Sequence, residues 1–282
     1  MAALATIAPF GFSFDPVRLL TAYRSLGCTA CQFYRSEENP PSAAEALRAS
    51  LAAGVPFDSI HGRFGAGIDP SAPCAEHRRW CLNLYEEEGR LARDLVGESG
   101  GGASPMVVVH PAGWTCGRAL LTRQEAAESD RYREPFLREF MVALAEIGER
   151  LGVTYLIENQ PFNTWMGSDP ALLAQRILAV GSARIRMCLD TGHANITTGD
   201  VAAAVRAAAP AIAYFHIHDN DGAVDDHRMP GEGTVDWTAF AAALRETGCA
   251  AVRMLEVFHD EARVEAAVAA GLGTRLREAL AL

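Results

Sequence analysis

Short apolar runs alternate along the chain with longer stretches of helical character. The runs predict eight strands, at Ile7–Phe14, Cys28–Arg35, Phe57–Phe64, Met106–Ala112, Thr154–Gln160, Ile185–His193, Ile212–Asp219 and Val252–His259. The stretches between them predict helices at Pro16–Leu26, Ala43–Ala53, Ala75–Val96, Gln124–Leu151, Pro170–Val180, Val201–Ala208, Trp237–Thr247 and Ala262–Leu282. This alternation is typical of a parallel sheet whose strands are joined by crossover helices.

Residues that commonly begin and end helices flank several of the predicted helices. Asp15 and Asp169 each precede a proline, and Asp236 precedes Trp237, as N-terminal capping residues do. Glycines follow other helices, where a residue with positive φ is usually needed, at Gly27, Gly152 and Gly248. The caps support the boundaries that the apolar pattern gives.

Eight strand–helix units predict closure into a (β/α)8 TIM barrel, an α/β fold with one domain over residues 1–282. The alternative, an open dinucleotide-binding sheet, requires a G-x-G-x-x-G turn after an early strand. The glycine-rich stretch Gly97–Gly102 instead precedes a strand and carries no lysine. We interpret it as a loop at the end of the barrel away from the active site.

Composition narrows the class of protein further. The chain is 49% hydrophobic and carries a formal net charge of −10, which disfavours a nucleic-acid partner. Its seven cysteines are odd in number and irregularly spaced, which favours a reducing compartment. Cys28 and Cys31 form a C-x-x-C motif, but they lie in a predicted strand and are expected to be core thiols. No signal peptide or membrane-spanning run is found, so we expect a cytoplasmic protein.

Ionisable residues stand at the C-terminal ends of six consecutive predicted strands. They are His61, His110, Glu158, Asp190 with His193, His216 with His218, and Glu256. Active sites of TIM barrels lie at these strand ends. A buried carboxylate needs a partner to offset its desolvation, and a divalent metal ion such as Zn²⁺, Mn²⁺, Co²⁺ or Mg²⁺ is an efficient one. No cysteine is expected at these positions, which argues against a structural zinc site.

Two tryptophans follow strand ends and are candidates to stack on a sugar face, namely Trp114 and Trp165. Packing in the core or in a lid is the alternative for both. The loops Gly113–Arg123 and Gln160–Asp169, in which they lie, are expected to close a small-molecule pocket.

Five segments combine the ionisable residues into motifs. They are IENQ with Glu158, CLDTGHAN with Asp190 and His193, FHIHDNDG with His216, DDHRMPGEGTVDW with Asp225 and His227, and LEVF with Glu256. From about His61 onward the chain thereby resembles the xylose isomerase-like TIM barrel superfamily. Its members include sugar and sugar-phosphate isomerases and epimerases, and abasic-site endonucleases of the endonuclease IV type.

The resemblance to the single-metal epimerases implies a metal site on Glu158, Asp190, His216 and Glu256. It also implies that the two glutamates are the catalytic acid/base pair, one on each face of the sugar. His218 shares a strand face with His216 but is expected nearer the mouth, and not as the primary ligand.

The resemblance to the endonucleases implies a larger set with three metals. The additional ligands, or substrate-binding residues, would be His61, His110, His193, Asp225 and His227. The acidic balance and the lack of clustered lysines argue against DNA binding. The epimerases commonly carry an arginine soon after the strand-seven histidine, whereas the nearest here is Arg228.

We therefore predict a metal-dependent isomerase or epimerase that transfers protons next to a carbonyl bound by the metal, on a small-molecule carbohydrate. The alternatives are a phosphoesterase of the endonuclease IV type and a carbohydrate-acid dehydratase or lyase. No membrane partner is expected, and self-association of the chain is left open.

Overall fold

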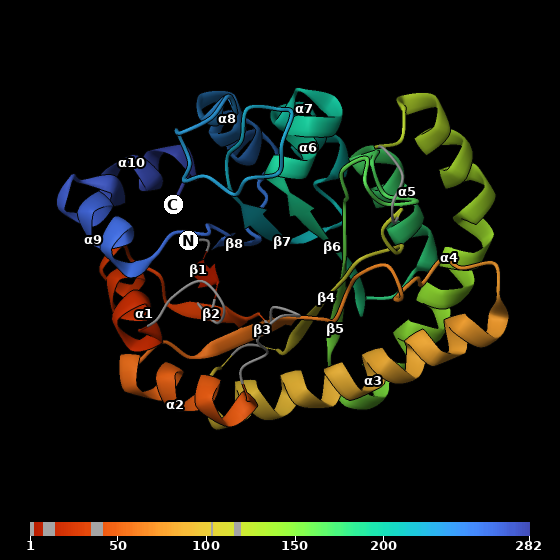
Figure 1. Cartoon of the computed structure of the whole chain (residues 1–282), viewed down its shortest axis with the longest axis horizontal. Helices are drawn as coiled ribbons and strands as arrows, with labels where there is room; N and C mark the ends of the chain where they lie inside the picture. Colours follow the sequence, from red (N-terminus) through yellow and green to blue (C-terminus); the bar gives the residue numbers. More distant parts are fainter. Residues whose placement is uncertain (1–2, 8–14, 35–41, 103, 116–119) are drawn as a thin grey trace.

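The computed structural model describes residues 3–7, 15–34, 42–102, 104–115 and 120–282. Eight parallel strands pair in sequence order, and the first also pairs with the eighth, which closes the barrel. Helices surround the strands on the outside (Figure 1). The predicted TIM barrel is confirmed.

The strands are β1 (Leu4–Ile7), β2 (Ala30–Phe33), β3 (Phe57–His61), β4 (Met106–Val109), β5 (Thr154–Glu158), β6 (Ile185–Asp190), β7 (Ile212–Ile217) and β8 (Val252–Leu255). The helices of the described chain are α1 (Pro16–Ser25), α2 (Ala43–Ala53), α3 (Ala75–Glu98), α4 (Arg123–Leu151), α5 (Pro170–Val180), α6 (Thr191–Thr198), α7 (Val201–Ala208), α8 (Trp237–Thr247), α9 (Glu261–Ala269) and α10 (Leu272–Ala279).

Most predicted strands extend past the observed strand ends, and three of the differences change how the elements are arranged. The first strand ends at Ile7 and does not begin there, and residues 8–14 of the prediction lie outside the described chain. The sixth strand stops at Asp190, whose side chain caps the unpredicted helix α6 by accepting a hydrogen bond from the His193 N–H at 2.7 Å. The last predicted helix is divided into α9 and α10 at Gly271, whose φ of 79° interrupts the helix.

The predicted helix caps are present. The side chains of Asp15, Asp169 and Asp236 each accept a hydrogen bond from a backbone N–H in the first turn of the following helix. Gly152 and Gly248 end α4 and α8 in the left-handed conformation. Each cap satisfies backbone groups that have no partner within the helix.

The core has two parts, one on each side of the strands. Side chains between strands and helices form the larger part, and a smaller cluster fills the barrel interior. The interior cluster consists of Ala5, Ile7, Val108, Leu156, Cys188, Tyr214 and Met254. Because side chains alternate across a strand, the residues two positions after Val108, Leu156, Cys188, Tyr214 and Met254 point to the same side, toward the mouth. The interior packing thereby directs the candidate site residues inward.

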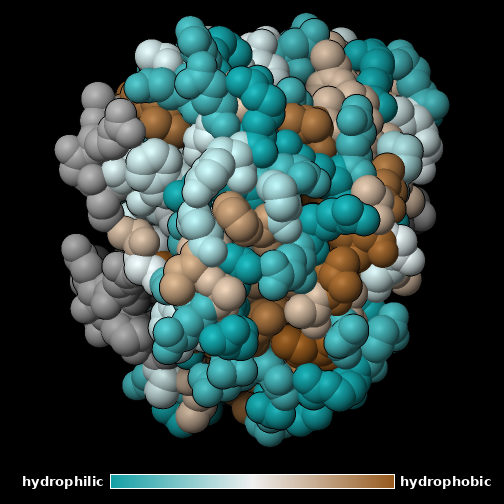
Figure 2. Space-filling model, turned by 90° about the vertical axis from the view of Figure 1, so that its right-hand side faces the viewer, coloured by the Kyte–Doolittle hydropathy of each residue, from teal (hydrophilic) through white to brown (hydrophobic). Residues whose placement is uncertain are grey.

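None of the helices in the described ranges has the length and apolar character to cross a bilayer. Hydrophilic side chains cover most of the face in Figure 2, with apolar ones in separate patches between them.

A buried carboxylate lies inside the barrel at Asp58, which is only 4% exposed. Its Oδ1 accepts hydrogen bonds from Ser59 Oγ at 2.7 Å and from Tyr214 Oη at 3.1 Å. Burial raises the pKa of Asp58 from 3.8 to about 6, although these two hydrogen bonds act to lower it.

We predict that Asp58→Asn stabilises the protein at pH 8 but not at pH 4. The folded state retains the Asp58 proton up to about pH 6, whereas the unfolded chain loses it near 3.8. The free energy of unfolding therefore falls as pH rises through this window, by roughly 3 kcal/mol in all. Denaturant unfolding at both pH values measures the difference, with Asp94→Asn on the exposed face of α3 as the control. An equal effect of Asp58→Asn at both pH values would contradict the prediction.

Candidate metal centre

Three carboxylates surround one imidazole nitrogen at the mouth of the barrel. The Nδ1 atom of His216 lies 2.6 Å from Glu158 Oε1, 3.0 Å from Glu256 Oε2 and 3.8 Å from Asp190 Oδ2. All four side chains are buried, with exposures of 4% or less. The structure therefore brings together the four residues predicted as metal ligands.

Charge attraction holds this group together. Burial acts to lower the pKa of His216, but its neighbours Cys188, Glu256 and Glu158 raise it well above its ordinary value. Burial acts to raise the pKa of Glu256, but His216 lowers it to about 2. The pKa of Glu158 is likewise lowered well below its ordinary value, against burial, by His216 and His110. The three carboxylates thus require positive charge in their midst, as an imidazolium or as a cation.

The donor set fits a divalent cation. Carboxylate oxygens and an imidazole nitrogen are ligands that Zn²⁺, Mn²⁺ and Co²⁺ accept. Buried polar atoms without a hydrogen-bond partner in the described chain also lie in the site, among them His110 Nδ1 and Asp225 Oδ1. Such atoms carry a desolvation cost that a bound ion or substrate would offset.

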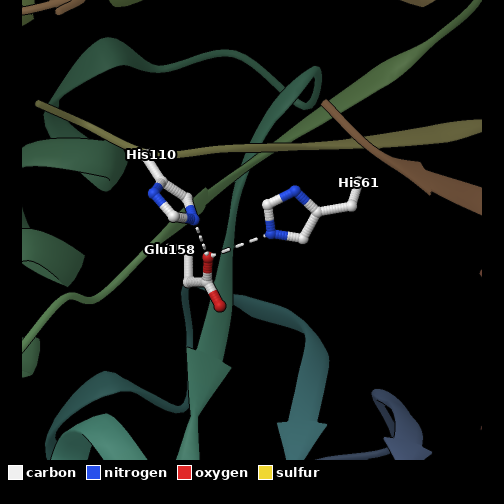
Figure 3. A group of neighbouring side chains, drawn as sticks. All are labelled: His61, His110 and Glu158. Atoms are coloured by element: carbon white, nitrogen blue, oxygen red, sulfur yellow. Dashed lines mark ion pairs between the residues drawn. The ribbon is translucent and has the colours of Figure 1, made fainter. Parts of the chain in front are cut away.

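Glu158 also belongs to a second group, with His61 and His110 (Figure 3). Its Oε2 lies 2.9 Å from His110 Nε2 and 3.8 Å from His61 Nε2. Figure 3 shows both imidazoles directed at this one oxygen, while the other oxygen points away from them. Gln160 Nε2 donates to the same Oε2 at 3.2 Å. Glu158 therefore joins the two groups through its two oxygens.

A third group of predicted residues lies around the carboxylate of Asp225. Its Oδ2 lies 3.1 Å from His193 Nε2 and 3.4 Å from His227 Nε2. The other ring nitrogens are held by the backbone, since His193 Nδ1 contacts Asn159 O at 2.8 Å and His227 Nδ1 contacts Glu256 O at 2.9 Å. His227 has a φ of 45°, a costly conformation outside glycine.

His218 lies beneath this third group and is completely buried. Its Nε2 lies 3.0 and 3.1 Å from the two oxygens of Asp190, and its ring stacks on that of His227 at 3.9 Å. It belongs to two groups that could hold a metal ion, one with Asp190 and His193 and one with Asp225 and His227, so its secondary role on the strand stays a prediction. The residue before His193 is Gly192, where a Cβ atom would lie 1.9 Å from Cε1 of His218.

The loop that carries Asp225 and His227 is anchored by Asp219, a residue that the sequence reasoning missed. Its Oδ1 accepts from the N–H groups of Asn220 and Val235, and its Oδ2 accepts from Gly231 N and Trp237 Nε1, each at 2.9 to 3.1 Å. These four hydrogen bonds satisfy a buried carboxylate without metal. The sequence shows an acidic residue at the end of this strand. Nothing in the sequence distinguishes a carboxylate that anchors a loop from one that binds a metal.

No cysteine stands among the strand-end residues, but one lies directly below them. Cys188 is buried on β6, two residues before Asp190 on the same strand face. Its sulfur, a carboxylate oxygen of Glu158 and a ring nitrogen of His216 all lie within 4.8 Å of one another. Period-two alternation from Asp190 could have found it.

A cavity of about 490 Å³ opens above the three groups. Its described lining consists of Tyr34, His61, Phe64, His110, Trp114, Glu158, Gln160, Pro161, Asn163, His193, Asp225, His227, Glu256 and Phe258. Trp114 lines the cavity, and its contact with a substrate stays a prediction. Trp165 is not part of this lining, because its ring packs against the core with the guanidinium of Arg133 over it at 5.2 Å. Arg228 is also absent from the lining, and its side chain pairs with Asp226 and Asp221.

The two loops predicted to close the pocket pair with each other. Trp114 and Thr164 form an antiparallel bridge, and Thr115 N donates to Asn163 O at 2.8 Å. Residues 116–119 of the first loop lie outside the described chain. The described part of the two loops therefore forms one side of the cavity as a unit.

Comparison with known proteins identifies the family. Residues 20–278 match the family of xylose isomerase-like TIM barrels, and the chain belongs to this family. It is 33% identical over 123 residues to L-ribulose 3-epimerase of Mesorhizobium japonicum, covering 43% of this chain and 39% of that protein. It is 27% identical over 116 residues to D-psicose 3-epimerase of Agrobacterium fabrum, covering 41% and 38%. The matched segments thus span about two fifths of these relatives.

Similarity of fold extends over the whole chain. A solved structure of L-ribulose 3-epimerase superposes with a TM-score of 0.75 at 22% identity, covering 99% of this chain and 96% of that one. This likeness confirms the barrel architecture.

We predict that His216→Ala abolishes binding of a divalent ion, whereas His218→Ala weakens it by about 10–100-fold. The first change removes a predicted ligand, and the second removes an imidazole that contacts the predicted ligand Asp190, and the loss of such a supporting group typically has an effect of that size. Isothermal titration with Zn²⁺ or Mn²⁺ measures both, with His77→Ala on α3 as a remote control. The reverse order of effects would overturn the ligand assignment.

We further predict that Gly192→Ala destabilises the protein by roughly 1–3 kcal/mol, the usual cost of overpacking. The added methyl group would overlap the buried ring of His218. Gly97→Ala, which has nothing within 4 Å, is the matched control. If the overlap is the cause, the loss should be smaller when Gly192→Ala is introduced into His218→Ala. An unchanged loss in that background would refute it.

Proposed function

We propose that the protein is a metal-dependent isomerase or epimerase of a small carbohydrate. The observation that carries this proposal is the convergence of Glu158, Asp190 and Glu256 on a single imidazole nitrogen of His216. Two of these carboxylates, Glu158 and Glu256, also line the cavity. They come from strands at separate positions around the barrel and can approach a substrate from different sides.

Proton transfer beside a carbonyl group suits this arrangement. A divalent ion held by the four residues would polarise the carbonyl and hydroxyl oxygens of a sugar and so acidify the intervening C–H bond. Glu158 and Glu256 are then placed to remove a proton on one face and return one on the other. His110, whose pKa is lowered by burial, is predominantly neutral at pH 7 and within reach to exchange a hydrogen bond with Glu158.

The cavity lining favours an uncharged substrate. One part of it is aromatic, with Tyr34, Phe64, Trp114 and Phe258. The remainder offers hydrogen-bonding groups such as Gln160 and Asn163. No arginine is found in the described lining, and the sequence contains no lysine. Aromatic faces and neutral polar groups suit the apolar ring face and hydroxyl groups of a free sugar, whereas a phosphate ester calls for cationic groups.

Two similar proteins support this choice of chemistry. The curated relatives are named as 3-epimerases of D-psicose and L-ribulose, both of which are ketoses. We therefore propose a free ketose or a related cyclic polyol ketone as the substrate.

A second candidate function is phosphodiester hydrolysis. It is favoured by the arrangement of His61, His110, His193, Asp225 and His227 into two further groups beside the first. Several metal ions held in this way can activate water and stabilise a leaving oxygen. The lack of arginine in the described lining, together with the lack of lysine in the sequence, counts against DNA as the substrate. Cleavage of a duplex oligonucleotide with one abasic site distinguishes this candidate.

We predict that Glu158→Gln and Glu256→Gln each reduce turnover by about 10²–10⁴-fold or more while the barrel stays folded. Loss of a positioned base typically costs this much, and each glutamate is also a proposed ligand. A panel of ketoses, inososes and sugar acids is followed by NMR in D₂O, which reports epimers, dehydration products and exchanged C–H protons separately. Metal content and circular dichroism are measured on the same samples.

Glu149→Gln, an exposed glutamate of α4, is the control and should retain full activity. If either active-site variant exchanges a substrate proton without forming the epimer, the two-base mechanism is supported. Turnover near the native rate in either variant would mean that another residue is the base. Dehydration products in place of epimers would assign the lyase chemistry instead.

A further inference from the structure

The floor of the candidate metal centre contains a thiol, that of Cys188. Its exposure is 0%, and it belongs to the interior cluster of the barrel with Tyr214 and Leu156. In the sheet register, Cys188 of β6 is directly opposite Glu158 of β5. The next residue on its strand face is Asp190, which pairs with His216 of β7. Cys188 is therefore adjacent to three of the four proposed ligands.

The sulfur is close enough to share an ion with them. One donor atom each from Cys188, Glu158 and His216 lie within 4.8 Å of one another. Ligands of one ion in tetrahedral or octahedral arrangements are separated by roughly 3 to 4.5 Å, given metal–donor bonds of about 2.0–2.3 Å. The sulfur thus lies within, or a small side-chain rotation from, the distance that direct coordination requires.

Two other buried thiols in the described chain contact backbone carbonyl groups. The Cys28 and Cys31 sulfurs lie 3.6 and 3.5 Å from the carbonyl oxygens of Ala5 and Val55, as core thiols commonly do. Cys188 instead faces carboxylates and an imidazole. A thiol offers only a weak hydrogen bond to such groups, whereas as a thiolate it is a strong ligand for a soft or borderline ion.

We propose that Cys188 is an additional ligand of the metal centre and that the site therefore selects a borderline ion such as Zn²⁺ or Co²⁺ over Mn²⁺ and Mg²⁺. The inference rests on the metal site in the proposed function. When the ion binds, a metal–sulfur bond forms, the S–H bond breaks and its proton passes to solvent. No change of oxidation state is involved. The selectivity follows because thiolate sulfur favours Zn²⁺ and Co²⁺, whereas a site of oxygen and nitrogen alone would also suit Mn²⁺.

Cobalt spectroscopy tests the assignment directly. The metal-free full-length protein is titrated with Co²⁺, and the near-ultraviolet spectrum is examined for thiolate-to-cobalt charge transfer. The band should be present in the native protein and in Cys31→Ser, a matched buried strand cysteine, and absent in Cys188→Ser. Competition titrations should show that Cys188→Ser loses more Zn²⁺ affinity than Mn²⁺ affinity. The Zn²⁺ loss should at least equal the roughly 10–100-fold that changes around a ligand typically cause.

The outcomes separate this inference from the proposed function. Saturable Co²⁺ binding without the charge-transfer band in the native protein would overturn the sulfur ligand and leave the four-residue site standing. A band that persists in Cys188→Ser would likewise overturn it. Failure of Co²⁺ and Zn²⁺ to bind the native protein would overturn the metal centre itself. If Cys188→Ser does not fold, the presence or absence of the charge-transfer band in the native protein and in Cys31→Ser still decides whether a sulfur other than that of Cys31 binds the ion.

Discussion

Three buried carboxylates at one point of the barrel mouth set the constraint on which the rest of the site depends. Glu158, Asp190 and Glu256 cannot all remain ionised beside one another in a desolvated position unless positive charge lies between them. The imidazole of His216, whose pKa these neighbours raise well above its ordinary value, lies between them with its Nδ1 in contact with two of the carboxylates. A divalent ion would meet the same requirement more completely. The chemistry proposed for the site follows from this arrangement of charge.

The barrel positions these groups by simple alternation. Leu156, Cys188, Tyr214 and Met254 fill the interior, and the residue two positions later on each strand is one of the four proposed ligands. The surrounding histidines are held by hydrogen bonds to the backbone and by the loop that Asp219 anchors. This support orients the side chains in advance, which a catalytic site requires.

Much of this arrangement could be predicted from the sequence. The strand–helix alternation predicts the barrel, and ionisable residues after apolar runs predict which side chains meet at its mouth. Their grouping could not be predicted in the same way, because whether Asp219 or Asp190 binds a metal depends on contacts between loops and strands far apart in the chain. The close approach of Gly192 to the ring of His218 could not be predicted either, for the same reason. Helix α6 was missed because Asp190 is both the end of a strand and a helix cap, and the apolar pattern gave only the first role.

The choice of substrate depends less on the barrel core than on the loops that line the cavity. The aromatic and neutral polar lining favours a free sugar, and the two additional histidine groups leave room for a site with several ions. Both candidate functions require an ion at the position between Glu158, Asp190, His216 and Glu256. Anomalous scattering from a crystal grown with Zn²⁺ or Co²⁺ tests that position directly. The account predicts a peak bonded to all four residues at about 2.0–2.3 Å. A map without a peak there, with His216 still hydrogen-bonded to Glu158 and Glu256, would contradict it.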